Sequence, residues 1–391
     1  MTNTRPRELA LWDLGFRPFF FGAMSASPLF MLAWIGAYTG VMDVGGPFAF
    51  SAWHAHEMIF GYSAAVIAGF LLTAAFNWAN LPTATGGRLA LAALIWLLGR
   101  VTILAGDALP YWLPAVLDVS FLPVVATLVA VPLIRARQWR NLIFVPILLA
   151  LAVLNACAHL NALGRLPGAD HWPLQLAVYV IVLLIVLIGG RVVPFFAERA
   201  LPGVHLRRWP ILDGFCIATL VALAIADLLD EQGMVVAAAG AAALVHAARW
   251  TGWWARDVWK RPMLWVLYVG YGWLIIGFGL MACAGAGLMP ESLAAHAWTT
   301  GAIGTMTLGM MVRVSLGHTG RPVVRAPKPA VWAFVLINIG TLARVLLPLA
   351  APDHYLDLIV LAGVLWTAAF LLVLAVCGPM LLQPRAGLAS Q

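Results

Sequence analysis

The sequence has few charged residues. Asp, Glu, Lys and Arg make up 10% of its 391 residues, whereas 63% are hydrophobic. Soluble globular domains carry about 25% charged residues, because their surfaces face water. The shortage excludes a soluble enzyme or a soluble binding domain. It predicts an all-α polytopic membrane protein, with residues 1–391 forming a single integral membrane domain.

Cysteine and clustered positive charge are also scarce. The four cysteines lie far apart, and no CxxC or CxxCH motif occurs, so neither a zinc clip nor covalent attachment of c-type haem is indicated. The net charge of +7 comes from basic residues scattered over short loops, which does not predict a nucleic-acid partner. The first apolar run is longer than a signal-peptide core, so we expect it to be retained as a span.

Long apolar stretches fill most of the chain. A spanning helix needs about 20 apolar residues, and proline and glycine mark the ends of such stretches here. Twelve spans are predicted. They are Phe16–Gly40, His54–Trp78, Arg88–Ala105, Trp112–Ile134, Asn141–Ala162, Pro173–Val193, Pro210–Leu229, Gly233–Trp250, Met263–Gly287, Leu293–Leu316, Ala330–Ala350 and Tyr355–Leu382.

The basic residues predict the orientation of these spans. Of the 23 Lys and Arg residues, all but Arg100, Arg165 and Arg344 fall at the termini or in the even-numbered loops. Loops rich in Lys and Arg remain in the cytoplasm. Both termini are therefore predicted to be cytoplasmic, and the lipid bilayer surrounds the chain.

Several ionisable residues would then lie near the outer face. His54, His56 and Glu57 open the second span, His159 lies near the outer end of the fifth, and His296 near that of the tenth. Ionisable groups in membrane helices are costly and are usually functional. His54 and His56 are about 200° apart around a helix and cannot face one metal, whereas His54 and Glu57 share a face. A lone histidine at a membrane end can instead be an interfacial anchor.

This arrangement permits a haem site between the second and tenth spans. Two imidazoles from facing helices, such as His56 and His296, can clamp a haem iron, and copper also accepts imidazole. Arg100 and Arg344 fall in the outer half of the membrane, where they could neutralise haem propionates. The alternative is an ion pair with Asp118, which lies at a similar depth.

A second polar motif lies at the cytoplasmic ends of the sixth and tenth spans. The segments GGRVVPFFAERA (189–200) and LGMMVRVSLGHTGRP (308–322) contain Arg191, Arg313 and His318. These residues could bind an anion or the propionates of a second haem. The alternative is a positively charged cytoplasmic loop that is held in place by an Arg–Glu ion pair.

The longest motifs resemble those of one membrane-protein family. LWDLGFRPFF (11–20), WHAHEMIFGY (53–62), GFLLTAAFNW (69–78), the 189–200 segment and HAWTTGAIGTMTLGMMVRVSLGHTGRP (296–322) are similar, in this order, to the NnrS family. The resemblance implies a protein of the bacterial inner membrane that contains haem b and copper and acts in nitric oxide metabolism and in tolerance of nitrosative stress. His54, His56 and His296 are then the leading metal ligands, with His318, Arg191 and Arg313 in the other shared motif.

Two features limit what the resemblance implies. Relatives have a histidine where this chain has Tyr268, so copper has one ligand fewer or uses a phenolate. Haem–copper oxidases also have twelve spans, with haem ligands at the outer ends of spans two and ten. Here spans six and seven offer no histidine for an oxidase-type copper site, so an oxidase or nitric oxide reductase centre is not expected.

The sequence therefore predicts a haem protein that binds or handles nitric oxide or iron-nitrosyl species, with an electron donor of the respiratory chain as a further partner. Whether it catalyses a reaction or only binds is left open. A cofactor-free transporter is one alternative, although transporters usually place their polar groups near the midplane. A factor that delivers haem or copper to respiratory enzymes is another.

Overall fold

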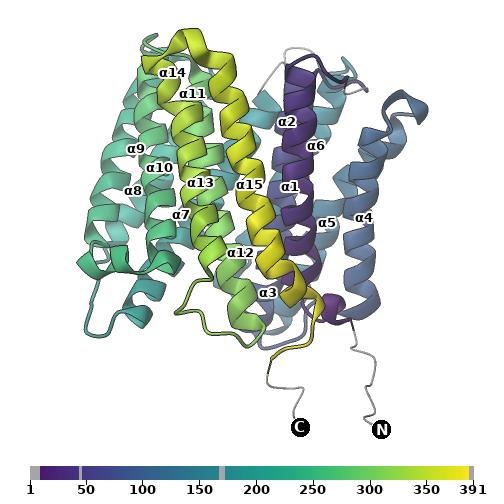
Figure 1. Cartoon of the computed structure of the whole chain (residues 1–391), viewed down its shortest axis with the longest axis vertical. Coiled ribbons are helices and arrows are strands. Elements are labelled where there is room, and N and C mark those ends of the chain that lie inside the picture. The colour runs from purple at the N-terminus through teal and green to yellow at the C-terminus, as the bar shows by residue number, and fades with distance from the viewer. Residues whose placement is uncertain (1–8, 44–45, 167–171, 387–391) are drawn as a thin grey trace. The chain divides into compact units, whose positions relative to one another are not determined.

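The computed structural model describes residues 9–43, 46–166 and 172–386, and within these ranges it contains helices and no strand (Figure 1). The chain folds as two compact units. Unit 1 comprises the described residues of Met1–Ala177, Val314–Pro322 and Phe370–Gln391. Unit 2 comprises Val178–Arg313 and Val323–Ala369. The single membrane domain expected from the sequence stays a prediction.

The helices are distributed over both units. Unit 1 holds α1 (Phe16–Tyr38), α2 (Phe50–His56), the π-helix η2 (Glu57–Ser63), α3 (Ala64–Ala79), α4 (Gly86–Leu104), α5 (Trp112–Arg135) and α6 (Phe144–Ala162). Unit 2 holds α8 (Pro210–Leu228), α9 (Gln232–Gly252), α10 (Pro262–Gly285), α11 (Glu291–His296), the π-helix η6 (Ala297–Gly304), α13 (Lys328–Val345) and α14 (Leu347–Ala350). Residues of α7 (Trp172–Ala200), α12 (Thr305–His318) and α15 (Tyr355–Leu382) fall in both units. Short 3₁₀ turns are η1 (Ala10–Trp12), η3 (Gly106–Ala108), η4 (Trp139–Asn141), η5 (Arg256–Lys260) and η7 (Pro352–His354).

The all-α polytopic fold is confirmed. Eleven helices of the described residues are long and apolar enough to cross a membrane, and they coincide with eleven of the twelve predicted spans. The tenth predicted span corresponds to the continuous helical segment α11–η6–α12 and is not among the eleven. This segment is less apolar because it contains His296, Arg313 and several threonines and glycines.

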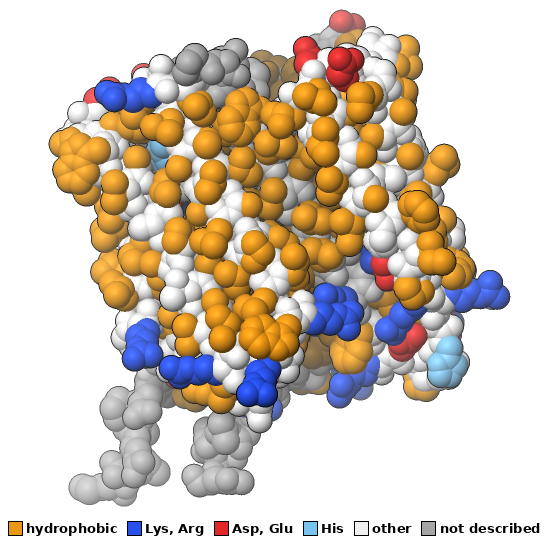
Figure 2. Space-filling view, turned by 180° about the vertical axis from the view of Figure 1, so that it is seen from behind, with side chains coloured by type: hydrophobic (Ala, Val, Ile, Leu, Met, Phe, Trp, Pro, Cys, Tyr) orange, Lys and Arg blue, Asp and Glu red, His pale blue; other side chains and the backbone are white. Residues whose placement is uncertain are grey.

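The surface fits a lipid environment. On the face shown in Figure 2, hydrophobic side chains cover the middle of the helices, and most Lys and Arg side chains lie near the helix ends at the lower edge. This distribution has the form that the charge pattern predicts for a protein with basic cytoplasmic loops. The orientation in the bilayer stays a prediction.

Unit 1 is held together by contacts between neighbouring helices. The helix α1 packs against α3, and α4, α5 and α6 pack side by side in chain order (Figure 1). A Cβ atom at Gly99 would lie 3.1 Å from the Cα atom of Asp118, so glycine permits the close approach of α4 and α5. Arg17, near the start of α1, donates to the carbonyls of Leu381 and Gln383 at 2.8 Å each. The start of α1 and the end of α15 therefore lie at the same end of unit 1.

Unit 2 is built in the same manner. Helices α8, α9 and α10 pack in chain order, and η6 packs against α10 and α13. A Cβ atom at Gly277 would lie 2.3 Å from the indole ring of Trp298 on η6. Small residues let membrane helices approach in this way, because their backbones can then come into direct contact.

The two π-helices follow similar short helices. The helix α2 ends at His56 before η2, and α11 ends at His296 before η6. A π-turn widens the helix and frees backbone carbonyls, and such turns are frequent at functional sites. In η2, the carbonyl of Gly61 accepts a hydrogen bond from Trp96 Nε1 at 2.9 Å. This bond joins the π-turn to α4.

Candidate metal centre

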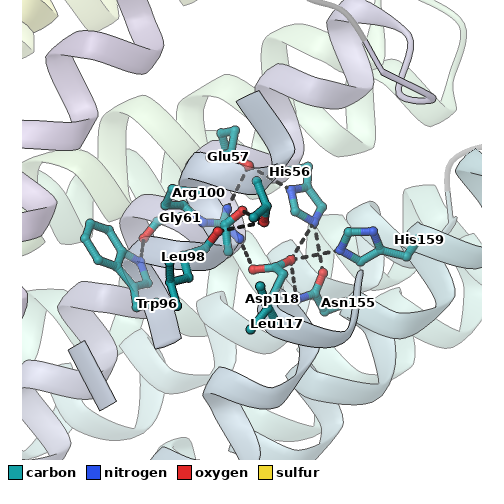
Figure 3. A network of polar contacts seen from close by, with 12 residues as sticks. His56, Glu57, Gly61, Trp96, Leu98, Arg100, Leu117, Asp118, Asn155 and His159 are labelled. Carbon is teal, nitrogen blue, oxygen red and sulfur yellow. Dashed lines mark hydrogen bonds and ion pairs between the residues drawn. The ribbon is translucent and has the colours of Figure 1, made fainter. Parts of the chain in front are cut away.

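A buried polar cluster lies inside unit 1 (Figure 3), where α2 passes into η2. Four segments supply it. They are α2–η2 with His56 and Glu57, α4 with Arg100, α5 with Asp118, and α6 with Asn155 and His159. Each of these six residues is at most 3% exposed. Ionisable groups buried this deeply must be paired or must coordinate an ion, because the apolar bundle cannot solvate them.

The carboxylate of Asp118 is the centre of the cluster. Its Oδ2 atom accepts from Asn155 Nδ2 at 2.8 Å and lies 2.9 Å from His159 Nε2 and 3.2 Å from His56 Nε2. Its Oδ1 atom forms an ion pair with Arg100. Arg100 also donates to Glu57 Oε1 at 2.7 Å and so holds both carboxylates.

In each of the two imidazoles, the ring nitrogen that faces away from Asp118, Nδ1, also has a hydrogen-bond partner. His56 Nδ1 lies 3.1 Å from Glu57 Oε1, and His159 Nδ1 lies 2.7 Å from Tyr111 Oη. Burial raises the pKa of Tyr111, which precedes the α5 span, so its hydroxyl keeps its proton at neutral pH. Metal-bound histidines commonly have such a partner on the outer nitrogen, because it fixes the tautomer and the ring orientation.

The hydrogen bonds around His56 call for one more positive charge. Its Nδ1 faces the Glu57 carboxylate, while its Nε2 faces Asp118 Oδ2 and, at 2.9 Å, Asn155 Oδ1. All three atoms are acceptors, and a neutral imidazole has one N–H to offer. Two carboxylates with one guanidinium also leave the cluster with one net negative charge. A proton on His56 or a metal ion at Nε2 would satisfy both requirements.

Three ligand atoms converge at one point. One atom each of His56, Asp118 and His159 lies within 4.8 Å of the other two. Two ligands of a tetrahedral ion with bonds of ~2.1 Å lie about 3.4 Å apart. The separations of 2.9 and 3.2 Å between Asp118 Oδ2 and the two Nε2 atoms are hydrogen-bond distances somewhat shorter than that spacing, so small side-chain movements would admit an ion. The donor set thus fits a single transition-metal ion.

A porphyrin does not fit between these two imidazoles. Both Nε2 atoms point to the same oxygen of Asp118, and the ring centroids are 5.0 Å apart. The carboxylate of Asp118 and the amide of Asn155 occupy the space that a haem between them would need (Figure 3). The cluster fits an ion rather than haem.

Residues 10–385, nearly the whole chain, match the family model described as NnrS protein. The chain belongs to the NnrS family. NnrS proteins are bacterial membrane proteins associated with nitric oxide metabolism and, in general terms, with metal or haem binding. No curated protein matches the chain at a significant level.

The structure brings together four of the residues singled out from the sequence. His56 and Glu57 belong to the 53–62 motif, whereas Arg100 and His159 lie outside the NnrS motifs. Glu57 Oε1 contacts the ring of the adjacent His56, a contact that the helix-face pattern of His54 and Glu57 did not predict. The ring of His54 stacks on Trp34, with the ring centroids 4.5 Å apart. For Arg100, the ion pair with Asp118 that the sequence left as an alternative is present.

The remaining outer residues belong to unit 2. His296 Nδ1 hydrogen bonds to the carbonyl of Ser292 at 2.6 Å, and the Arg344 guanidinium lies 5.7 Å from the ring centre of Tyr355. Both ring nitrogens of His56 are engaged inside unit 1. The pairing of His56 with His296 on one haem iron stays a prediction, and so does the propionate role of Arg344.

In the second polar motif, Glu198 forms an ion pair with Arg208, which lies beyond the 189–200 segment, so an Arg–Glu pair of the kind named in the simpler alternative is present. The guanidinium of Arg313 lies 3.8 Å from the ring centre of Phe196 and donates to the carbonyl of Met263. Arg191 is half-buried on α7, and His318 packs beside Phe16 in unit 1. The anion or second-haem site expected from these residues stays a prediction.

Tyr268 uses its hydroxyl as a donor to the backbone carbonyl of Trp253, at 2.8 Å. It therefore keeps its proton and is not arranged as a phenolate ligand. Asn155 and Tyr111 were not predicted from the sequence, and Asp118 was predicted only as a partner for arginine. The one sequence signal for Asn155 was its spacing of four residues from His159, which places both on one face of α6.

Proposed function

We propose that this chain is a metalloprotein of the bacterial inner membrane that binds nitric oxide at a single transition-metal ion held by His56, Asp118 and His159. The convergence of these three donors, with both outer imidazole nitrogens held by Glu57 and Tyr111, carries the proposal. NnrS membership supplies the link to nitric oxide. With the predicted orientation, the centre lies near the periplasmic face.

The donor set and the nitric oxide link together favour copper or non-haem iron, because zinc accepts the same ligands but cannot exchange an electron. Two imidazoles and a carboxylate suit either ion, and for iron(II) this set leaves coordination positions open for a diatomic ligand. Such an ion would supply a site at which nitric oxide binds and exchanges an electron. Of the two cofactors that the resemblance implies, copper fits this cluster. Haem b would need another site, for which His296, His318, Arg191, Arg313 and Arg344 remain the candidates.

The surrounding side chains prepare the centre for the ion. Arg100 holds Asp118 and Glu57 together, so that their negative charges are fixed before a metal arrives. The rings of Phe48 and Phe60 lie 4.6 and 5.2 Å from that of His56 and exclude water. Nitric oxide is small and apolar, so it reaches such a site through the lipid and the bundle.

Metal analysis of the purified protein tests the proposal. We expect about one copper or iron ion per chain in the wild type, and a loss of at least about tenfold in Asp118→Asn and His159→Ala, because each removes a ligand. His354→Ala is the matched control, since His354 pairs with Asp357 on the surface. Addition of nitric oxide to the reduced protein should give a metal-nitrosyl signal in electron paramagnetic resonance.

Three results would contradict the proposal. Unchanged metal content in both variants would remove the site from this cluster. A folded, colourless and metal-free wild type would favour the transporter. Substoichiometric metal that a chelator removes at once would favour the delivery factor. A haem spectrum that survives in both variants but disappears in His296→Ala or His318→Ala would place haem elsewhere in the chain.

A further inference from the structure

A second buried polar cluster lies in unit 2. His246 and Arg249 come from α9, Tyr271 from α10 and Cys216 from α8. Tyr271 Oη lies 2.7 Å from His246 Nδ1 and accepts from Arg249 Nη1 at 3.1 Å. His246 Nε2 lies 3.3 Å from the carbonyl of Cys216. None of the side chains in the metal centre takes part.

The donors and acceptors fix the position of each proton. Arg249 can only donate, and the backbone carbonyl of Cys216 can only accept. His246 therefore carries its proton on Nε2, and its bare Nδ1 accepts from the Tyr271 hydroxyl. The phenol of Tyr271 is thus aimed at a base that can take its proton.

Tyr268 lies one turn earlier on α10 and provides an internal comparison. Both tyrosines are buried, at 1% exposure for Tyr268 and 0% for Tyr271. Tyr268 donates to the backbone carbonyl of Trp253, which cannot accept a proton outright. A phenol loses an electron more readily when its proton can leave at the same time. Of this pair, only Tyr271 is built for that step.

The surroundings of Tyr271 would protect an oxidised ring. The rings of Trp253 and Phe278 lie 4.8 Å from those of Tyr271 and His246, respectively. Arg249 pairs with Asp213 at 2.6 Å. This carboxylate offsets the charge of the guanidinium, which would otherwise disfavour a proton on His246. A Cβ atom at Gly190 would lie 1.8 Å from Arg249, so a glycine at this position leaves room for the guanidinium.

We propose that Tyr271 is a redox-active tyrosine that reduces nitrogen dioxide, the radical formed when nitric oxide meets oxygen in an apolar phase. Nitrogen dioxide takes one electron from Tyr271 and becomes nitrite. The O–H bond of Tyr271 breaks, and its proton forms an N–H bond at His246 Nδ1. The products are nitrite, a phenoxyl radical and an imidazolium, and a one-electron donor such as a thiol or ascorbate returns the electron while the proton returns to Tyr271. The inference rests on the nitric oxide link of the proposed function but not on the metal.

Pulse radiolysis tests this step on Asp118→Asn protein that a chelator has made metal-free, as metal analysis verifies, with nitrogen dioxide generated from nitrite. We expect a phenoxyl radical in this background and with Tyr268→Phe added, and its loss with Tyr271→Phe. His246→Gln keeps an acceptor oxygen for Tyr271 but cannot take its proton. It should slow radical formation roughly 100-fold, the lower end of what a positioned base contributes. The background should react more slowly in D₂O, and His246→Gln should lose that difference.

The opposite pattern would overturn the proposal. It fails if Tyr271→Phe leaves the radical yield unchanged, or if His246→Gln reacts at the background rate with the same solvent isotope effect. If Tyr271→Phe does not fold, the rate and the isotope effect of His246→Gln decide alone. Because the protein is metal-free throughout, this result is independent of whether the metal centre of unit 1 exists.

Discussion

Asp118 shows how much of the metal centre depends on single side chains. Its two oxygens contact Arg100, His56, Asn155 and His159, which come from three other segments. Ion pairs in an apolar interior are not themselves strongly stabilising, but removing one partner leaves an uncompensated charge. The cluster should therefore tolerate little change at any one position.

The first prediction concerns Arg100. Arg100→Leu leaves Glu57 and Asp118 buried without their guanidinium, so we expect a loss of about 3–5 kcal/mol in unfolding free energy. Arg208→Leu is the control, because it removes the exposed pair with Glu198 and should cost at most about 1 kcal/mol. Reversible denaturation in mixed micelles measures both, and equal losses would show that the buried pair has no special role.

For single residues, the sequence predicted which side chains belong to the site better than it predicted the contacts between them. His56, Glu57 and His159 could be singled out, because ionisable groups are rare in membrane helices. That His159 and Asp118 meet His56 could not be predicted, since it depends on how α5 and α6 pack against α2. The helix face pairs Glu57 with His54 and gives no sign of its contact with His56. The contact with the adjacent His56 forms at the start of a π-turn.

Among the elements, the packing of α10 against η6 depends most directly on glycine. Gly277 faces Trp298, while Gly279, on the same helix, has no atom of another side chain or helix within 4 Å of a Cβ position. Alanine substitutions at these two positions therefore separate the effect of close packing on stability from that of helix propensity.

The second prediction uses this pair. Gly277→Ala places a methyl group against a rigid indole and should destabilise the protein by about 1–3 kcal/mol. Gly279→Ala should be neutral or stabilise it by up to about 1 kcal/mol, because alanine favours the helix. Thermal denaturation in detergent compares them, and equal melting temperatures would contradict the close contact.

The sequence predicted most helix positions to within a few residues, because apolar length and the flanking proline and glycine residues are strong signals in membrane proteins. It predicted the tenth span as an ordinary helix, whereas the structure has α11, a π-helix and α12 there. The π-turns could not be predicted, since no composition rule distinguishes their hydrogen bonding from that of an α-helix.

For the whole molecule, metal binding should be coupled to stability. An ion that binds the folded chain alone stabilises it by RT ln(1 + [L]/Kd), which is about 2.7 kcal/mol at a free concentration of 100 Kd. Three segments of unit 1 supply the ligands, so an unfolded chain does not reproduce the site.

The third prediction follows from this coupling. Removing the ion with a chelator should lower the melting temperature of the wild type, and restoring copper or iron should raise it again. Asp118→Asn should melt at the same temperature with and without the chelator. A chelator shift of equal size in the variant would mean that the stabilising ion binds somewhere else.

Unit 1 contains segments that are far apart in the sequence, and this affects how it folds during synthesis. Arg17 is fastened to the carbonyls of Leu381 and Gln383, more than 360 residues later in the chain. Chains generally begin to fold from the N-terminus as the ribosome makes them. The helix α1 therefore holds a buried guanidinium whose acceptors are made only when the ribosome reaches the end of α15. Until α15 is complete, Arg17 lacks these acceptors, so the start of α1 should reach its final packing later than the contacts among α3, α4, α5 and α6.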